Sequence, residues 1–340
     1  MDLPFNEFRA TVFVVGHHVF DFLSVLLNTT LLYLIIFHTS KSFRSYSVIL
    51  GCLAISEDVL GFTAWFSMAR CVPVGHTLIY QFHGICRKVS PQFCLDVHAI
   101  VAHCSAYNYF IMPVSFWYRH HILYHGPPRP SKVARILFFL YIPSFLAMIF
   151  LSVSTSESNL IRNILRTQKP SSAYPDDPNI VAVAGFEKFY QKLTLGMLIT
   201  VCLPIFPGYC SAIYCRNRIL KKLNDNTRMS SSTIRVQRNL IKALTIQAIL
   251  PVLHMSQCSV YVWKQLELPF SDRMPYFEEM FVLQSALSAI TPCITMYYVR
   301  PYRRKIKEFL GLRKPKRSMN IHMDTSNIDK ISTKNTDEIV

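Results

Sequence analysis

The sequence predicts an all-α integral membrane protein, a bundle of seven transmembrane helices. Two observations concern composition: 51% of the 340 residues are hydrophobic, and only 16% are charged, well below the quarter or so that is usual for soluble domains. The third concerns spacing. Seven stretches of the chain each offer the roughly 20 mostly apolar residues that a helix needs to cross about 30 Å of hydrocarbon.

The seven apolar stretches follow one another with polar connections between them. The last four contain no Asp, Glu, Lys or Arg, whereas Asp21, Glu57, Asp58 and Asp96 lie in the first three. The predicted helices cover residues 14–37, 47–69, 95–118, 136–153, 193–214, 243–263 and 280–299. They define a transmembrane domain over residues 14–299, which follows an N-terminal segment of residues 1–13.

The distribution of positive charge indicates how the bundle lies in the membrane. Of the 36 Lys and Arg residues, 25 fall in the connections on the side of the C-terminus and 11 in those on the side of the N-terminus. Lys and Arg gather in cytoplasmic loops, where the anionic inner leaflet attracts them. We therefore expect an extracellular N-terminus and a cytoplasmic C-terminus. The net charge of +16 then needs no nucleic-acid partner, and no phosphate-binding loop or RNA-binding motif accompanies it.

The two ends of the chain differ in character. Residues 1–10 lack the basic segment of a cleaved signal peptide, so the first helix is expected to act as its own insertion signal. Residues 300–317 are basic and predict an amphipathic helix along the lipid surface, with an apolar face made by Tyr302, Ile306, Phe309 and Leu310. Residues 318–340, rich in Ser, Thr, Asn and Asp, predict a disordered cytoplasmic tail.

Two connections on the N-terminal side are long. Residues 154–192 are expected to form an exposed irregular loop, because the connection carries Pro170, Pro175, Asp176, Asp177 and Pro178. Residues 70–94 contain three cysteines, Cys71, Cys86 and Cys94. If this connection faces an oxidising compartment, we expect one disulfide and one remaining thiol, with the pairing open at this point.

Polar side chains within the apolar stretches predict an interior network. Asn28 and Asp58 are costly in hydrocarbon unless they face the bundle interior and find partners, and a water molecule can join them. Glu57 and Asp58 are adjacent, so they point about 100° apart and cannot both face one pocket well. We choose Asp58 as the inward carboxylate and leave Glu57 open. A structural contact between helices is as good an explanation of this pair as a switching role.

Prolines recur inside the predicted helices. A proline frees a backbone carbonyl and can kink a helix, which a bundle tolerates because neighbouring groups satisfy the carbonyl. Static shape explains such kinks as well as motion does. As hinges that would let helix ends swing, we select Pro204, Pro207, Pro251 and Pro292.

The segment SFWYRHHIL, residues 115–123, closes the third predicted helix. His121 and His125 have the i, i+4 spacing of two metal ligands on one helix face. No second histidine cluster is expected on the same side, so we predict no metal and no cofactor. Arg119, read from its position alone, is a basic collar that reaches toward lipid phosphates. No catalytic motif appears in a loop, and we predict that the protein is not an enzyme.

Several short segments, in order, resemble the nematode serpentine receptor class delta (Srd) family of chemoreceptor-like seven-helix receptors. They are Arg44-Ser45-Tyr46-Ser47, His83-Gly84-Ile85-Cys86 with Cys94, Phe116-Trp117-Tyr118-Arg119, Leu244-Thr245-Ile246-Gln247 with Pro251, and Pro301-Tyr302-Arg303. The resemblance covers about residues 20–310. It implies a rhodopsin-like bundle in the plasma membrane of sensory neurons or their cilia, which detects environmental chemicals or pheromones and signals through a heterotrimeric G protein.

The resemblance also implies roles for individual residues. Arg119 matches the arginine that ends the third helix on the G-protein side, and Tyr118 stands where better-studied receptors of this fold usually carry an acidic residue. The Asn-Pro-x-x-Tyr pattern of the seventh helix is absent. The connection after the fourth helix holds no cysteine, so the usual bridge to it cannot form. Cys86 with Cys94 becomes the preferred disulfide, with pairings through Cys71 as alternatives.

A small-molecule or volatile ligand would bind in the outer halves of the third, sixth and seventh helices. The polar candidates there are His98, His254, Gln257, Tyr261 and Gln284. The alternative function is a multi-pass transporter or channel, which would need polar residues along several helices and usually an internal repeat; we find no repeat. The expected partners are a G protein, a small ligand and membrane lipids, with no nucleic acid.

Overall fold

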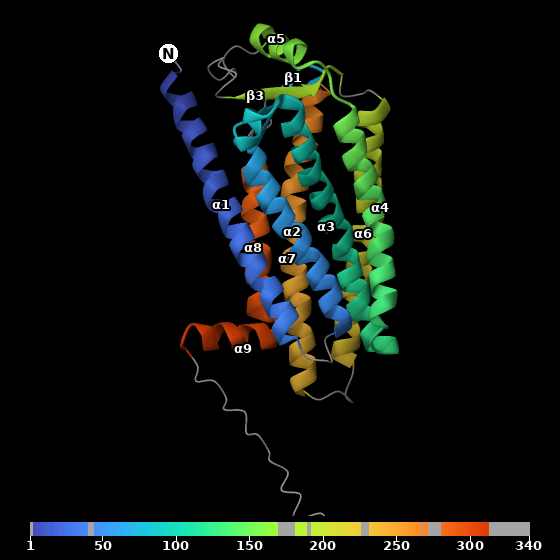
Figure 1. Ribbon diagram of the computed structural model, residues 1–340. Helices are drawn as coiled ribbons and strands as arrows, with labels where there is room; N and C mark the ends of the chain where they lie inside the picture. The colour runs from blue at the N-terminus through green and yellow to red at the C-terminus, as the bar shows by residue number, and fades with distance from the viewer. Residues whose placement is uncertain are drawn as a thin grey trace, which may run out of the picture. The chain divides into compact units, whose positions relative to one another are not determined.

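The computed structural model describes residues 3–39, 44–168, 181–188, 192–225, 231–266, 268–270 and 280–312. Long helices run side by side, and a small sheet with one short helix lies across one end of them (Figure 1). The helices are α1 (Leu3–His38), α2 (Arg44–Ser67), α3 (Pro91–His125), α4 (Pro130–Val153), α5 (Ser158–Gln168), α6 (Lys192–Asp225), α7 (Ser231–Gln265), α8 (Met280–Tyr298) and α9 (Arg300–Phe309). We call the end that carries the sheet the sheet end, and the opposite end the Arg119 end.

Each of the seven predicted spans coincides with a long helix, which confirms the predicted fold class. Six of the seven helices are longer than their predicted spans, and α8 is one residue shorter. α2 ends at Ser67, two residues before the predicted end of its span, because Ala69 already belongs to a strand. α1 begins at Leu3, inside the segment expected to precede the first span, and α3 continues to His125. α6 and α7 extend to Asp225 and from Ser231, so most of the connection expected between them is helical. The apolar stretch of a helix shows only which part lies in hydrocarbon. The backbone hydrogen bonds of the helix can continue into the polar residues on either side.

In the described part of the chain, six helices are long and apolar enough to cross a membrane: α1, α2, α4, α6, α7 and α8. α3 has the length but is more polar, with His98, His103 and Asn108 all buried. It contacts α2, α4, α6 and α7, so it lies in the interior of the bundle. Because neighbouring helices surround it, α3 can carry polar groups that a lipid-facing helix could not.

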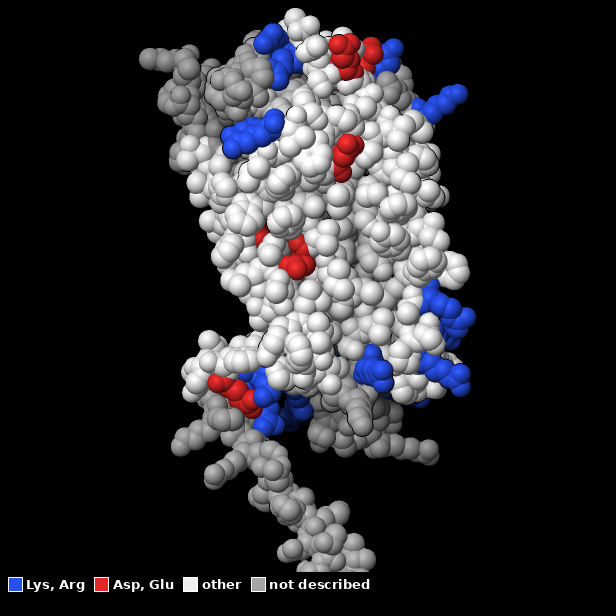
Figure 2. All heavy atoms as spheres, viewed as in Figure 1, with Lys and Arg blue, Asp and Glu red and all other residues white. Residues whose placement is uncertain are grey.

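The surface of the bundle agrees with a membrane environment. Large apolar side chains are exposed on the outer helices, among them Phe138 and Phe139 on α4 and Leu203 and Phe206 on α6. On the face shown in Figure 2, Lys and Arg lie toward the two ends of the bundle, and the middle is almost free of them. In water such an apolar belt would be unfavourable; in hydrocarbon it is required.

The sheet end has regular structure that the sequence analysis did not predict. Strands β1 (Ala69–Val74), β2 (Thr77–Phe82) and β3 (Ala182–Phe186) form an antiparallel sheet in the order β1-β2-β3. β1 and β2 are joined by Gly75 and His76, and β3 pairs with β2 from Leu78↔Phe186 to Phe82↔Ala182. The expectation of an irregular loop over residues 154–192 is therefore wrong for α5 and β3. The prolines and aspartates of residues 170–178 lie outside the described residues.

A disulfide fixes the chain between the sheet and α3. Cys86, in the short 3-10 helix η2 (Ile85–Lys88), is bonded to Cys94 in the first turn of α3, and Cys71 on β1 is buried as a reduced thiol. The preferred pairing is thus confirmed and the pairings through Cys71 are wrong. Cys71 packs in the same apolar core as the disulfide, between the sheet and the helices.

Residues 304–340 form a second compact unit. Glu308 lies 3.0 Å from Nε of Arg304 and 2.9 Å from Nζ of Lys305, and these cations lower the pKa of its carboxyl group. Residues 313–340, including the predicted tail, lie outside the described residues. Tyr302 belongs to the first unit. It is buried, and its hydroxyl lies 2.9 Å from Oγ1 of Thr39. The expectation that Tyr302 is part of an apolar face turned to lipid is therefore wrong. The surface location of the helix stays a prediction.

His83, between β2 and η2, predicts a pH dependence of stability. Burial and the nearby Arg70, Arg87 and His17 lower the pKa of His83 to about 3. In the unfolded chain the imidazole binds a proton near pH 6.5, so the unfolded state gains more protons as the pH falls. Stability is therefore full above pH 6.5 and falls below it, by up to about 1.4 kcal/mol per pH unit from this residue.

The measurement is the melting temperature of the purified protein between pH 7.5 and pH 5. The matched variant is His83→Gln, which cannot titrate in this range. We expect the wild-type melting temperature to fall more steeply below pH 6.5 than that of the variant. Equal slopes for the two proteins would contradict the assignment.

Candidate functional site

A cavity of about 170 Å³ lies between the helices near the sheet end. Residues from α3, α6, α7 and α8 form its walls, and Cys71, Leu78 and Tyr80 of the sheet close it toward the end of the bundle. Four of the five predicted ligand residues line it: His98, His254, Tyr261 and Gln284. The sequence placed these four on three separate helices, and the fold brings them to one space.

Gln257 does not line the cavity. On α7 the lining residues His254, Cys258 and Tyr261 follow at i, i+4 and i+7 and share one face, which Met255 and Val262 widen on one side. At about 100° per residue, Gln257 lies about 60° from His254 on the other side of that face. The sequence placed Gln257 on the correct helix, but it did not show toward which side of that helix its side chain points.

The cavity is mostly apolar with a few fixed polar groups. His98 packs edge-on against Phe281, with ring centroids 4.7 Å apart, and lies 4.8 Å from the ring of Tyr80. His254 is hydrogen-bonded to the hydroxyl of Tyr109 through Nδ1, and its Nε2 lies 3.8 Å from the sulfur of Cys258. A cavity of this kind holds a small apolar molecule and orients it through few polar contacts.

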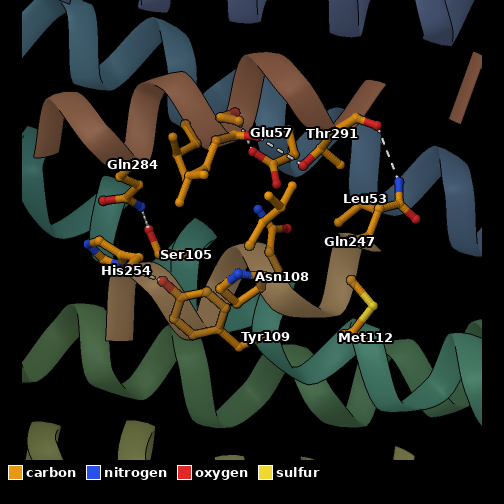
Figure 3. A pocket seen from close by; sticks show the side chains of 15 residues that line it. Leu53, Glu57, Ser105, Asn108, Tyr109, Met112, Gln247, His254, Gln284 and Thr291 are labelled. Atoms are coloured by element: carbon orange, nitrogen blue, oxygen red, sulfur yellow. Dashed lines mark hydrogen bonds between the residues drawn. The ribbon is translucent and has the colours of Figure 1, made fainter. Parts of the chain in front are cut away.

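A second, smaller cavity of about 50 Å³ lies deeper in the bundle (Figure 3). Figure 3 shows Glu57 from α2, Asn108 and Ser105 from α3, Gln247 and His254 from α7, and Gln284 and Thr291 from α8 around it. Ser105, Tyr109, His254 and Gln284 line both cavities. A change at the first cavity therefore reaches the polar side chains of the second directly.

Hydrogen bonds join the helices around the second cavity. Gln284 on α8 donates to Ser105 on α3, and Ser288 on α8 donates to the carboxylate of Glu57 on α2. Ser288 also meets Ser24 on α1 at 2.8 Å. Closer to the Arg119 end, Nε2 of Gln247 on α7 donates to Oγ1 of Thr295 on α8 at 2.9 Å. These bonds satisfy polar groups that lipid and apolar side chains could not.

The inward carboxylate is Glu57, which reverses the choice of Asp58. Glu57 is 8% exposed and faces Ser288, whereas Asp58 is partly exposed and accepts hydrogen bonds of 3.2 Å from Thr29 on α1. Asn28 is buried but donates to Ser24 in its own helix, at 2.9 Å to the carbonyl oxygen. Among the described residues no hydrogen bond joins Asn28 to Asp58, so the network differs from the predicted one. It is centred on Glu57, Ser24 and Ser288, and Asn28 joins it through Ser24.

At the other end of α3, Arg119 is buried. It is 2% exposed, and its guanidinium carbon lies 3.9 Å from the centre of the Tyr46 ring on α2. Tyr118 is also buried and stacks on Tyr46 with centroids 5.2 Å apart. A snorkelling collar would hold its charge in the headgroup region, so this burial contradicts the interpretation of Arg119 from position alone.

The prolines chosen as hinges lie within helices, Pro204 and Pro207 in α6, Pro251 in α7 and Pro292 in α8. Pro251 also borders the second cavity. At the same level α6 approaches α3 closely: a Cβ at Gly208 would lie 3.1 Å from Cγ of Pro113. His121 and His125 share a helix face as expected, with ring centroids 5.1 Å apart.

A bundle of apolar helices with a cavity toward one end and a buried arginine at the other has the fold of the rhodopsin-like membrane proteins. The crystal structure of squid rhodopsin matches the chain with a TM-score of 0.57 at 12% identity, over 87% of this chain and 79% of that chain. At this identity the likeness shows the fold alone.

The family model described as "Serpentine type 7TM GPCR chemoreceptor Srd" matches residues 13–308. Serpentine receptor class delta-3 of Caenorhabditis elegans is 31% identical over 300 residues, 86% of each chain. Serpentine receptor class delta-2 of the same nematode is 27% identical over 84% of this chain and 79% of its own. The chain belongs to the Srd family of serpentine chemoreceptors, as the short motifs indicated. It is a multi-pass membrane protein of a receptor family, and nothing in its structure favours a transporter.

Proposed function

We propose that this chemoreceptor binds a small molecule in the 170 Å³ cavity at the sheet end and activates a heterotrimeric G protein at the Arg119 end. The observation that carries the proposal is the shared wall of the two cavities. Ser105, Tyr109, His254 and Gln284 face both the ligand cavity and the polar layer around Glu57, so a ligand biases the contacts between α2, α3, α7 and α8.

The output end follows from α3 and the distribution of charge. α3 runs from the cavity to Arg119, and cations of the connections predicted as cytoplasmic lie near its end. Lys132 lies over the ring of Trp117, and Arg218 and Lys222 lie over the ring of Tyr124. The prolines of α6 and α7 provide bending points between the two ends. In this proposal the sheet end is extracellular, the receptor lies in the plasma membrane of sensory neurons or cilia, and its ligands are environmental chemicals or pheromones.

The test is expression with a panel of G proteins and a library of volatiles and pheromones, followed by a cavity-filling variant. Ala106 is buried in the wall of the cavity, and Ala106→Phe fills part of the space. We expect the ligand concentration for half-maximal nucleotide exchange to rise by about tenfold or more, since overpacking of such a site is costly.

The control is Ser259→Phe, which places the same ring on the exposed face of α7. It is expected to leave the response unchanged. Ligand-driven flux of ions or solutes without nucleotide exchange would contradict the proposal and favour a transporter or channel. An unchanged response in Ala106→Phe would place the ligand elsewhere.

A further inference from the structure

The described part of the ligand cavity's wall carries only uncharged residue types and histidines. Among the described residues that line it there is no Asp, Glu, Lys or Arg. A carboxylate or an ammonium group placed there would lose its hydration without gaining a counter-charge, which costs several kcal/mol. A charged molecule is therefore a poor ligand for this site.

Three polar side chains in the wall are left with hydrogen-bonding capacity. His98 on α3, Thr194 on α6 and Gln265 on α7 are 3%, 1% and 0% exposed. The Nδ1 atom of His98, the hydroxyl of Thr194 and the Oε1 atom of Gln265 have no hydrogen-bond partner among the described residues. Buried polar atoms without hydrogen-bond partners are rare in folded proteins. A molecule bound in the cavity would supply the missing partners.

The orientation of the Gln265 amide defines what it requires. Its Nε2 donates to the carbonyl oxygen of Gly75, in the turn between β1 and β2, at 2.6 Å. Oε1 is therefore the end turned away from that turn, and a carbonyl oxygen can only accept. A molecule that satisfies it must bring an O–H or N–H donor. The Thr194 hydroxyl, in the wall of the same cavity, can donate or accept.

We infer that the cavity selects an uncharged, largely apolar molecule with a hydroxyl group, which Gln265 and Thr194 bind at the sheet end. This inference rests on the proposed function and names the ligand class. The volume fits: apolar cavities of about 150 Å³ hold benzene. The aromatic rings of Tyr80 and Phe281 pack against the apolar part of the ligand.

Four probes of one shape test the ligand class: benzyl alcohol, toluene, benzoate and benzylammonium. Binding is measured without a G protein, as the rise in melting temperature of the purified receptor in lipid nanodiscs at pH 7. We expect benzyl alcohol to bind more tightly than toluene, by about fivefold for a neutral hydrogen bond. Benzoate and benzylammonium are expected to give no rise.

Paired variants test the residues. Thr194→Val keeps the shape of the side chain and removes the hydroxyl, so the affinity for benzyl alcohol should fall about fivefold while that for toluene stays unchanged. Thr200→Val is the control, since Thr200 lies on the same helix outside the cavity wall and bonds to the carbonyl oxygen of Gly196. Gln265→Met repeats the test for the acceptor, with its own melting temperature reporting any damage to the Gly75 contact.

Equal binding of a charged probe would overturn the inference, as would the failure of all four probes or an equal loss of both neutral probes in Thr194→Val. A receptor that binds benzyl alcohol as expected but never stimulates nucleotide exchange would leave the ligand class standing and would contradict the proposed function. The two failures are thus distinguishable.

Discussion

Replacing Arg119 by alanine is expected to reduce ligand-dependent nucleotide exchange at least about tenfold, to the level seen without ligand, while the receptor still reaches the membrane. The physical reason is the position of the guanidinium group. It is buried against the face of Tyr46 at 3.9 Å, held by an attraction worth about 1–2 kcal/mol when water is excluded. In the proposed active state the helix ends open and this cation faces the G protein.

The controls separate the charge from the packing. Tyr46→Phe keeps the ring and is expected to leave exchange close to that of wild type. Tyr46→Leu removes the ring and is expected to raise exchange without ligand, because the guanidinium then loses the contact that holds it. Purified receptor, nanodiscs and a nucleotide-exchange assay give the measurement, with the ligand-induced rise in melting temperature as the check on binding. Exchange in Arg119→Ala equal to wild type would exclude Arg119 from coupling.

The choice between Glu57 and Asp58 shows what sequence reasoning can and cannot reach. Both lie at mid-membrane depth, and depth alone does not separate them. The discriminating signal is the size of neighbours at helical spacing. Asp58 shares its side of α2 with Ile55 and Phe62, which are 54% and 58% exposed, whereas Glu57 shares a face with the buried Ala54 and Gly61. In a membrane the small residues mark the packed face, because lipid accepts large side chains.

The sheet was missed because its strands lack the usual alternation. All six residues of β2 are buried, so no polar side chain marks every second position. The available signal was the two-residue connection Gly75-His76 between two short apolar runs, with Gly75 at a φ of +49°. A six-residue strand is also much shorter than the roughly 20 apolar residues that identify a membrane span.

Four of the predicted ligand residues line the cavity because interior polar groups in a membrane protein are few and their depth follows from residue number. Gln265 and Thr194 were missed because they lie near helix ends, where polar side chains normally face water or headgroups. Here Gln265 is buried beneath the turn between β1 and β2, to which it donates, and Thr194 is buried in the wall of the cavity. The sheet is built from segments distant in sequence, so the sequence of one helix does not reveal that its end is covered.

The position of the sheet depends on the close approach of Gly84 to the backbone at the end of α2. Replacing Gly84 by alanine is expected to destabilise the receptor by about 3 kcal/mol or more. A Cβ at Gly84 would lie 2.1 Å from the carbonyl oxygen of Phe66 and 2.7 Å from the carbonyl carbon of Ser67. Those are backbone atoms at the end of α2 and cannot rotate away. The backbone N–H of Gly84 also donates to the carbonyl oxygen of Ser67 at 3.1 Å, so relief of the clash breaks this bond.

Gly51 supplies the matched control, because a Cβ there meets no atom within 4 Å and its position is inside α2. Gly51→Ala should be neutral or stabilising by up to about 1 kcal/mol, the helix preference of alanine over glycine. Melting temperature of the purified proteins and the fraction at the cell surface give the comparison. Since Leu78 and Tyr80 reach the cavity from the strand that leads to Gly84, residual Gly84→Ala receptor should also bind benzyl alcohol less tightly. Equal melting temperatures for the two variants would show that the sheet tolerates displacement and that the cavity does not depend on its position.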